Sequence, residues 1–296
     1  MGNKIESFGG DWTRIKLECL RQYLKAYTTA LNKKFKLYYV DAFAGTGYVK
    51  AKQCEHCGLL FPELSEGEGK QFIDGSAKIA LQTNPTFQKY FFIENDAENF
   101  QKLQLLKLEF PNLANNIIIE NREANEYLQE FCRRDWKNCR AIIFLDPYGM
   151  QVNWETIEII AKTQAIDLWW LFPLGVAVNR LLKRDGKIIE KCRETLNRMF
   201  GTTDWYNAFY RADNNNEKQG YFWEEDEESF VKIANFTTIK EYSIKRLETI
   251  FAGVSNKAKE LYNSSKNPLY LLIFASSSPT GAPIALRIAN HILEHI

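Results

Sequence analysis

Two carboxylates, each placed just after a predicted apolar strand, are the residues of this chain best suited to chemistry. The first, Asp41, ends an apolar run that begins at Leu37 and leads into a glycine-containing turn. Such a strand carries a carboxylate to its carboxyl end, where it can receive an ammonium group, and glycine lets the backbone approach a ligand without a Cβ clash. S-adenosylmethionine joins a ribose to an amino-acid tail, so we predict that this turn binds it. The candidate cofactor-binding residues of the turn are Asp41, Phe43, Ala44, Gly45 and Gly47.

Three further segments are predicted to complete the S-adenosylmethionine site. Glu94, followed by Asn95, ends the next strand and is placed to accept the two ribose hydroxyls. Glu123 and Ala124 follow the third strand and can reach the adenine amino group. Lys16, on the first helix, can reach the cofactor carboxylate or a phosphate, or it can be an ordinary solvated lysine. The alternative for the whole pattern is a tight strand-to-helix turn that holds no ligand.

The second carboxylate, Asp146, opens the sequence Asp-Pro-Tyr-Gly at the end of a later strand. Methylating an exocyclic amine of a base is difficult because the nitrogen lone pair is delocalised into the ring. The carboxylate of Asp146 and the carbonyl of Pro147 can accept the amine hydrogens, and Tyr148 offers a ring on which an extruded base can stack. We therefore predict that Asp146, Pro147, Tyr148 and Gly149 form a catalytic motif, and the alternative is a simple turn at the strand end.

The elements that must position these residues alternate between strand and helix. Five alternations predict right-handed βαβ crossovers and a mainly parallel sheet covered on both faces, which is an α/β, Rossmann-like fold. Gly75 and Ser76 are expected to open one of the helices, with Ser76 as its cap. The other expected helices are 11–30, 97–109, 124–134, 154–163 and a closing helix near 283–295. The expected strands are 37–41, 90–94, 117–120, 141–146, 166–173 and a last strand at 269–275.

The same pattern divides the chain into regions. Residues 1–175 and 266–296 are expected to form the core, with a loop insert at 50–74 that is rich in Gly and Glu. Residues 176–265 are expected to be a mainly helical insertion before the last strand and are a candidate region for target recognition. Within it, Arg180–Arg198 contains seven basic and three acidic residues. This run is either a solvated helix face or a patch that follows phosphates.

The overall composition limits the class of protein. The chain has 296 residues, 45% apolar and 25% charged, with a net charge of +1, so any nucleic-acid binding requires a local basic patch. We expect a cytoplasmic protein that does not enter a membrane, because neither a signal peptide nor a spanning segment is evident. Six cysteines are expected to be reduced. Cys54 and Cys57 form half of a zinc site, which a partner chain could complete.

The two motifs resemble those of known families. Asp41-x-Phe43-x-Gly45-x-Gly47, followed later by Asp-Pro-Tyr-Gly, is similar to class I S-adenosylmethionine-dependent methyltransferases that modify amino groups of bases. More closely, the chain resembles the TcmP family, the three-Cys-motif partner proteins. This resemblance implies a methyltransferase-like protein with a companion that carries a three-cysteine motif. The matching segments are 12–17, 38–47, 74–77, 90–94, 144–152, 171–176, 200–205 and 281–286.

The predicted activity is N-methylation of an exocyclic amine of a base in RNA or DNA. The target base stays open, because the catalytic motif resembles the Asp-Pro-Phe-Gly of tRNA guanine enzymes as much as the Asp-Pro-Pro-Tyr of adenine enzymes. Two alternatives also stay open. One is a non-catalytic partner or scaffold of a metal-cluster protein, and the other is a methyltransferase for a protein or small molecule. A nicotinamide oxidoreductase is disfavoured because Lys50 occupies the place of the third glycine.

Overall fold

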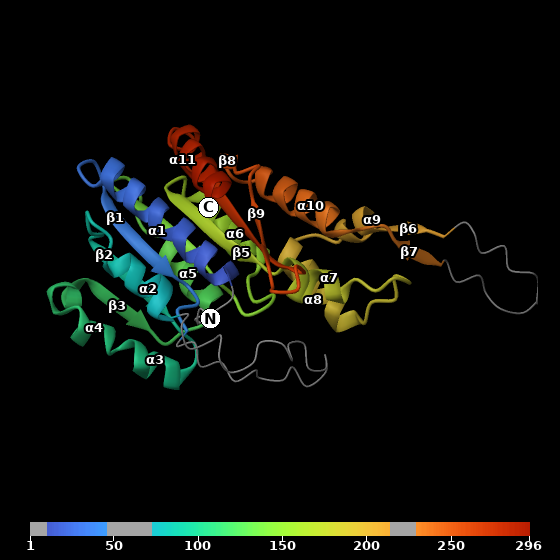
Figure 1. The fold of residues 1–296 in the computed structure, drawn as a ribbon, viewed down its shortest axis with the longest axis horizontal. Coiled ribbons are helices and arrows are strands. Elements are labelled where there is room, and N and C mark those ends of the chain that lie inside the picture. The colour runs from blue at the N-terminus through green and yellow to red at the C-terminus, as the bar shows by residue number, and fades with distance from the viewer. Residues whose placement is uncertain (1–10, 46–72, 214–228) are drawn as a thin grey trace, which may run out of the picture.

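The structure, a computed structural model, describes residues 11–45, 73–213 and 229–296 (Figure 1). Its main sheet has the strand order β3-β2-β1-β4-β5-β10-β8, and β9 also pairs with β10. Strands β1 to β5 run parallel, whereas β10 is antiparallel to β5, β8 and β9. The predicted α/β fold with a mainly parallel sheet is therefore confirmed. The strands are β1 (Lys36–Asp41), β2 (Lys89–Ile93), β3 (Ile117–Glu120), β4 (Cys139–Leu145), β5 (Ile166–Phe172), β8 (Gly253–Val254), β9 (Lys259–Tyr262) and β10 (Pro268–Ser276).

Helices pack on both faces of this sheet, because successive side chains of each strand point to opposite sides. On β1, Tyr39 joins one core cluster and Val40 joins the other. Helices α1 to α4 and α11 contribute to the Tyr39 cluster, and α5, α6 and α8 to α10 contribute to the Val40 cluster. The helices are α1 (Asp11–Leu31), α2 (Ile73–Leu81), α3 (Ala97–Leu103), α4 (Leu106–Glu109), α5 (Ala124–Cys132), α6 (Trp154–Lys162), α7 (Asn179–Leu181), α8 (Glu190–Phe200), α9 (Trp205–Phe209), α10 (Phe236–Glu248) and α11 (Ala282–His295), with short turns η1 (Pro111–Asn116) and η2 (Leu174–Val178).

The segment 176–265, expected to be mainly helical, is more mixed than the sequence predicts. Besides α7 to α10 it contains the hairpin β6 (Tyr210–Ala212) and β7 (Phe230–Lys232), which projects from the rest of the molecule (Figure 1). Strands β8 and β9 also lie in this range, and they pair with β10 and so belong to the main sheet. Strands of two to four residues give too few alternations to stand out as a sequence pattern.

One helix begins earlier than the sequence predicts. Helix α2 starts at Ile73, so Ser76 is its fourth residue and not its cap. The helix packs closely on α1 at Gly75, where an added Cβ would lie only 2.7 Å from Cδ1 of Leu17. Ser76 therefore lies within the first turn of α2 and does not cap it.

A buried acid lies at the amino end of β5, at the opposite edge of the sheet from Asp41. The hydroxyl of Tyr23 donates to Oδ2 of Asp167 at 2.7 Å. Burial raises the pKa of Asp167 from 3.8 to about 6, although the nearby side chains of Ser276 and Tyr23 favour the charged form. This pKa is higher in the folded than in the unfolded state. The contribution of Asp167 to stability is therefore fully present below its unfolded pKa of 3.8 and is lost progressively as the pH rises through about 6.

As the pH rises from about 5 to about 8, we expect the free energy of unfolding of Asp167→Asn to increase relative to that of wild type by roughly 1–2 kcal/mol. The amide is neutral at every pH, and its oxygen can still accept from Tyr23. Urea unfolding at both pH values measures the difference. Asp204→Asn, the same change at an exposed position, is the matched control. An identical pH response of all three proteins would show that Asp167 ionises in the fold without penalty.

None of the helices in the described residues combines the length and the apolar character that crossing a bilayer demands.

Candidate functional site

The two predicted carboxylates lie at neighbouring strand ends. Strand β1 pairs with β4 in parallel, with Asp41 opposite Phe144, and the ladder continues as the N–H of Ala42 donates to the Phe144 carbonyl at 3.2 Å. Asp146 follows directly after β4. In the strand order 3-2-1-4-5, the connections reverse direction between β1 and β4, and this is the position where doubly wound sheets bind ligands at their carboxyl edge. The fold therefore brings Asp41 and Asp146 to its topological switch point.

A buried lysine pairs with Asp146 and also lies within the electrostatic influence of Asp41. Nζ of Lys16, on α1, lies 2.6 Å from Oδ2 of Asp146, and their side chains are 0% and 13% exposed. Burial lowers the pKa of Lys16, while the charges of Asp146 and then Asp41 oppose this shift. The ammonium also lies 5.4 Å from the ring centre of Trp12 and 5.7 Å from that of Phe144. Lys16, predicted to contact the cofactor, is thus the partner of the predicted catalytic acid.

Asp41 is almost completely buried. Burial raises its pKa from 3.8 to about 7, and Asp146 adds to this, whereas the Ser76 side chain, Lys16 and the backbone of Phe43 favour the charged form. Neither carboxylate oxygen has a hydrogen-bond partner of good geometry in the described part of the chain. A buried carboxylate with open acceptor positions is costly unless a donor or cation reaches it.

Tyr39 adds a hydroxyl to the same cluster. It precedes Asp41 by two residues on β1, so both side chains point to the face that α1 covers. Burial, followed by the charges of Asp41 and Asp146, raises the pKa of Tyr39 well above its ordinary value. Tyr39 therefore stays a neutral phenol beside the two acids.

The turn after β1 is held against the end of β2. The N–H of Ala44 donates to the carbonyl of Ile93 at 2.9 Å, and the backbone of Gly45 lies close enough to favour the charged form of Glu94. The Glu94 carboxylate also accepts from the N–H of Asp96 at 2.8 Å, and burial is the main cause that raises its pKa. This carboxylate thus lies beside the first turn, where the sequence expects a contact to ribose.

Glu123 caps helix α5. Its carboxylate accepts from the N–H of Glu126 at 2.9 Å and from the amide of Asn125 at 2.7 Å. The same amide of Asn125 donates to the carbonyl of Gln151, and its oxygen accepts from the N–H of Asn153 and from the hydroxyl of Thr156. Asn125 thereby ties the start of α5 to the loop after β4. The carboxylate predicted to bind adenine already has two donors here.

The catalytic motif forms a tight turn in this loop. Pro147 and Gly149 are buried, Tyr148 is half-buried, and the N–H of Tyr148 donates to Oε1 of Gln151 at 2.9 Å. Gly149 has a φ of 76°, in the left-handed region that only glycine adopts without cost. The hydrogen bond from Lys16 goes to Oδ2 of Asp146, so Oδ1 keeps its capacity to accept from a ligand.

Some predicted residues fall outside the described part of the chain, namely Gly47, Cys54 and Cys57. The described ranges contain no cluster of three or more metal-ligating side chains. Asn95 lies at the surface beside Glu94, and its carbonyl accepts from the amide of Asn121 at 3.1 Å. Ala124 is buried at the first turn of α5.

Sequence reasoning missed three residues of this site. Tyr39 could have been found, because a period of two puts it on the same face as Asp41. Ser76 was taken for a helix cap, and its closeness to Asp41 follows only from the docking of α2. Asn125 gave no signal, because its four hydrogen bonds join segments that are up to 31 residues apart.

Comparison with known proteins gave matches in structure only. No family model matches the chain and no curated protein matches its sequence, so the resemblance to the three-Cys-motif partner family stays a prediction. Protein LPL1258 from Legionella pneumophila is similar at 12% identity and a TM-score of 0.48, over 96% of this chain and 92% of that chain.

Two enzymes are also among the similar structures. Magnesium protoporphyrin IX methyltransferase from Synechocystis, solved with bound SAH, has 11% identity and a TM-score of 0.39, over 93% of this chain and 88% of that chain. Spermidine synthase from Thermotoga maritima has 8% identity and a TM-score of 0.40, over 91% of this chain and 60% of that chain. The strand order and the strand directions define the fold.

Proposed function

We propose that the protein is an S-adenosylmethionine-dependent methyltransferase that acts on an exocyclic amine of a base in RNA or DNA. The observation that carries the proposal is the meeting of Asp41, Asp146 and Lys16 at the switch point of the sheet. When Asp41 is ionised, two acids and one cation in this largely buried cluster leave a net negative charge. This cluster suits a ligand that brings a positive charge and N–H donors.

The residues present fit the methionine part of S-adenosylmethionine. The buried oxygens of Asp41, which lack partners in the described part of the chain, can accept hydrogen bonds from an ammonium group. Glu94, at the next strand end, can accept from ribose hydroxyls. When bound, S-adenosylmethionine supplies an electrophilic methyl group.

Asp146 serves the acceptor amine. Its Oδ1 accepts an N–H of the amine, which keeps the nitrogen lone pair directed toward the methyl group, and it takes the proton that the nitrogen releases after alkylation. Lys16 donates to Oδ2 at 2.6 Å and thereby holds the carboxylate in one orientation. Tyr148, half-buried beside it, supplies a ring for stacking of the base.

The experiment that tests the function uses a tritiated methyl donor with total cellular RNA, DNA and protein as acceptors. The purified protein is incubated with each fraction, and incorporation is counted after removal of the donor. We expect label in a nucleic-acid fraction. Label in the protein or small-molecule fraction alone would assign the methyltransferase to another substrate class. No incorporation, together with no heat of cofactor binding in calorimetry, would exclude the proposed function.

Cofactor binding should depend on pH through Asp41. Only the ionised carboxylate can pair with an ammonium group, and the pKa of Asp41 is about 7. We therefore expect the affinity for S-adenosylmethionine to rise roughly fifteenfold between about pH 5.5 and pH 7, because the ionised fraction of Asp41 rises by that factor. Isothermal titration at several pH values measures the affinity.

Two variants control this titration. Asp41→Asn removes the titrating group and should bind more weakly, with an affinity that no longer changes over this pH range. Asp167→Asn removes a different buried acid with a raised pKa and should keep the pH dependence of wild type. A wild-type affinity that stays constant across the range would contradict the role given to Asp41.

A further inference from the structure

We propose that the segment Lys183–Lys187, here called the basic loop, is a preformed surface for the phosphate backbone of a nucleic acid. The proposal rests on the proposed function, because it names the part of the fold that holds the substrate beside the switch point. The basic loop has the sequence Lys-Arg-Asp-Gly-Lys, with three basic residues in five.

The basic loop lies at the carboxyl edge of the sheet. Strand β5 pairs with β4, and Trp170 lies opposite Leu145, the residue before Asp146. The chain leaves β5 at Phe172, makes the single turn η2 and the short helix α7, and then enters the basic loop. In Figure 1 the elements α7 and α8 extend beyond the carboxyl ends of the strands. A nucleic-acid strand bound along this edge can therefore contact both the basic loop and the switch point.

Helix α9 and the hairpin of β6 and β7 hold the backbone of the basic loop. The hydroxyl of Tyr210 donates to the carbonyl of Lys183 at 2.9 Å. The N–H of Lys232 donates to the carbonyl of Arg184 at 2.9 Å. The hydroxyl of Tyr206 donates to the carbonyl of Gly186 at 3.2 Å. Three of the five loop carbonyls are thus held by side chains or backbone of α9, β6 and β7. A surface fixed in this way loses little conformational entropy when it binds.

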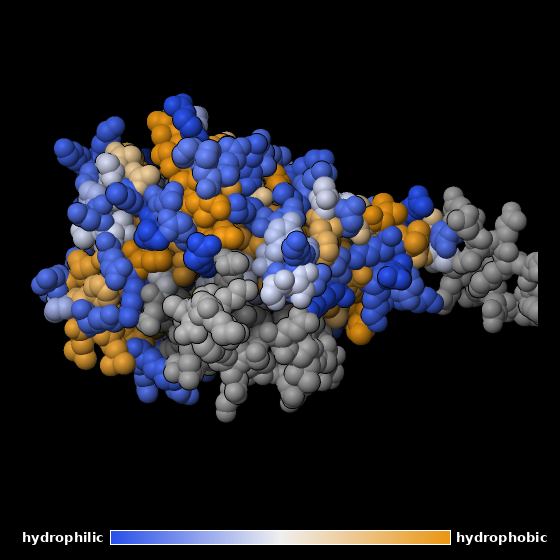
Figure 2. Space-filling model, viewed as in Figure 1, coloured by the Kyte–Doolittle hydropathy of each residue, from blue (hydrophilic) through white to orange (hydrophobic). Residues whose placement is uncertain are grey.

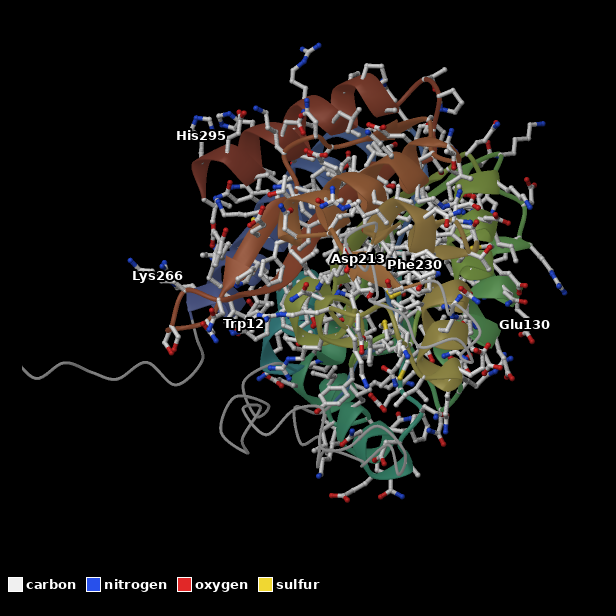
Figure 3. All side chains as sticks on the ribbon, turned by 90° about the vertical axis from the view of Figure 1, so that its right-hand side faces the viewer. Trp12, Glu130, Asp213, Phe230, Lys266 and His295 are labelled. Carbon is white, nitrogen blue, oxygen red and sulfur yellow. The ribbon has the colours of Figure 1, made fainter. Side chains whose placement is uncertain are left out.

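The glycine of the basic loop allows this close approach. Gly186 has a φ of 69°, and an added Cβ would lie 2.8 Å from the hydroxyl of Tyr206 and 2.9 Å from Cβ of Phe230. Within the loop, the Asp185 side chain accepts from the N–H of Lys187 at 3.1 Å. Figure 3 looks onto this end of the molecule and shows Phe230 beside Asp213 on the hairpin. Because it accepts the hydrogen bond from Lys187, Asp185 stabilises the turn of the basic loop.

The basic side chains of the loop point to solvent. Lys183, Arg184 and Lys187 are exposed, and neither Lys183 nor Arg184 forms an ion pair with any described residue. Lys232, half-buried beneath the loop, has its pKa lowered by burial and then by the charge of Arg184. In Figure 2 the surface in the region of α8 carries both hydrophilic and hydrophobic side chains. Four exposed basic residues flank the loop in the sequence or lie on the hairpin, namely Arg180, Lys191, Arg198 and Arg211.

Positive charge carried on a fixed backbone suits a ligand with regularly spaced anions. A nucleic-acid backbone presents one phosphate per nucleotide, and neutralising each phosphate releases bound counterions. The protein as a whole has a net charge of only +1, so the basic loop is a local feature and not part of a general polycation.

The test measures binding of a fluorescein-labelled strand of about 20 nucleotides by anisotropy, at salt concentrations from about 50 to 300 mM. Single-stranded RNA, single-stranded DNA of the same sequence and the DNA duplex are compared, which identifies the preferred backbone. The loop variant carries Lys183→Ala, Arg184→Ala and Lys187→Ala. The matched control carries Lys33→Ala, Lys34→Ala and Lys36→Ala, three exposed lysines at the opposite edge of the sheet.

We expect the loop variant to bind at least about tenfold more weakly near 100 mM salt, with a salt slope reduced by about 2, and the control to bind as wild type does. A charge-preserving variant with Lys183→Arg, Arg184→Lys and Lys187→Arg should retain wild-type affinity, and circular dichroism confirms that each variant folds. Equal affinities of the loop variant and wild type would overturn the proposal, as would a wild type that binds none of the three ligands.

The two proposals fail in different ways. If nucleic acid is bound through the basic loop but no methyl group is ever transferred, the binding surface stands and the proposed function falls. If nucleic acid is methylated equally by wild type and by the loop variant at all salt concentrations, the function stands and the surface falls.

Discussion

Replacing Asp146 with asparagine is expected to lower methyl transfer to nucleic acid about a thousandfold while leaving the affinity for S-adenosylmethionine within about threefold. Asparagine keeps the shape of the side chain, and its oxygen can still accept from Lys16. It loses the negative charge and cannot take up a proton from the acceptor amine. Tritium incorporation into the responsive RNA or DNA fraction measures the rate, and calorimetry measures cofactor affinity.

The matched control for this prediction is Asp167→Asn. It makes the same chemical change in a buried acid of the neighbouring strand, but at the opposite edge of the sheet. We expect it to retain methyl transfer within about threefold. Undiminished incorporation by Asp146→Asn would rule out the carboxylate as the proton acceptor, and a parallel loss of cofactor binding would assign Asp146 to the cofactor instead.

The second large effect is expected from Lys16→Met, which should lower the free energy of unfolding by roughly 3 kcal/mol at about pH 8. Methionine fills much of the space of the lysine chain but leaves the acids Asp146 and Asp41 facing each other without the buried cation. The loss should shrink near pH 5, where protonation of a carboxylate relieves the repulsion. Urea unfolding at both pH values measures it.

Two comparisons test the cause of that loss. The double variant Lys16→Met with Asp146→Asn should recover at least half of the lost stability, because no acid is then left without its counterion at that position. Lys102→Met removes a pair of the same 2.6 Å length, Lys102 with Glu98, whose side chains are 37% and 76% exposed. That surface pair should contribute less than about 1 kcal/mol. Equal losses in the free energy of unfolding for Lys16→Met and Lys102→Met would show that the buried ion pair stabilises the fold no more than the exposed pair does.

Much of the fold could be predicted because its signals are local. Continuous apolar runs such as those of β4 and β5 are typical of strands buried on both faces, and their alternation with helices predicts a parallel sheet. The same logic placed Asp41 and Asp146 at strand ends, and a parallel sheet then brings such ends to one edge. The short strands β6 to β9 were missed because two to four residues cannot show a period.

The site itself could be predicted only in part. A motif at a strand end is visible in the sequence, but the orientation of a long side chain on a distant helix is not. Lys16 is 130 residues away from Asp146, and their contact depends on the angle and depth at which α1 packs on the sheet. The fixed backbone of the basic loop likewise depends on hydroxyls of Tyr206 and Tyr210, which no local pattern connects to it.

The sequence by itself determined the alternation of strands and helices, and hence which edge of the sheet gathers the acids, because apolar periodicity acts over a few residues. Only the tertiary structure decided the charge balance at that edge. The ion pair of Lys16 and the burial that raises the pKa of Asp41 to about 7 both arise from packing between segments far apart in the chain. Electrostatic free energy depends on distance and burial in space, and neither quantity can be obtained from spacing along a sequence.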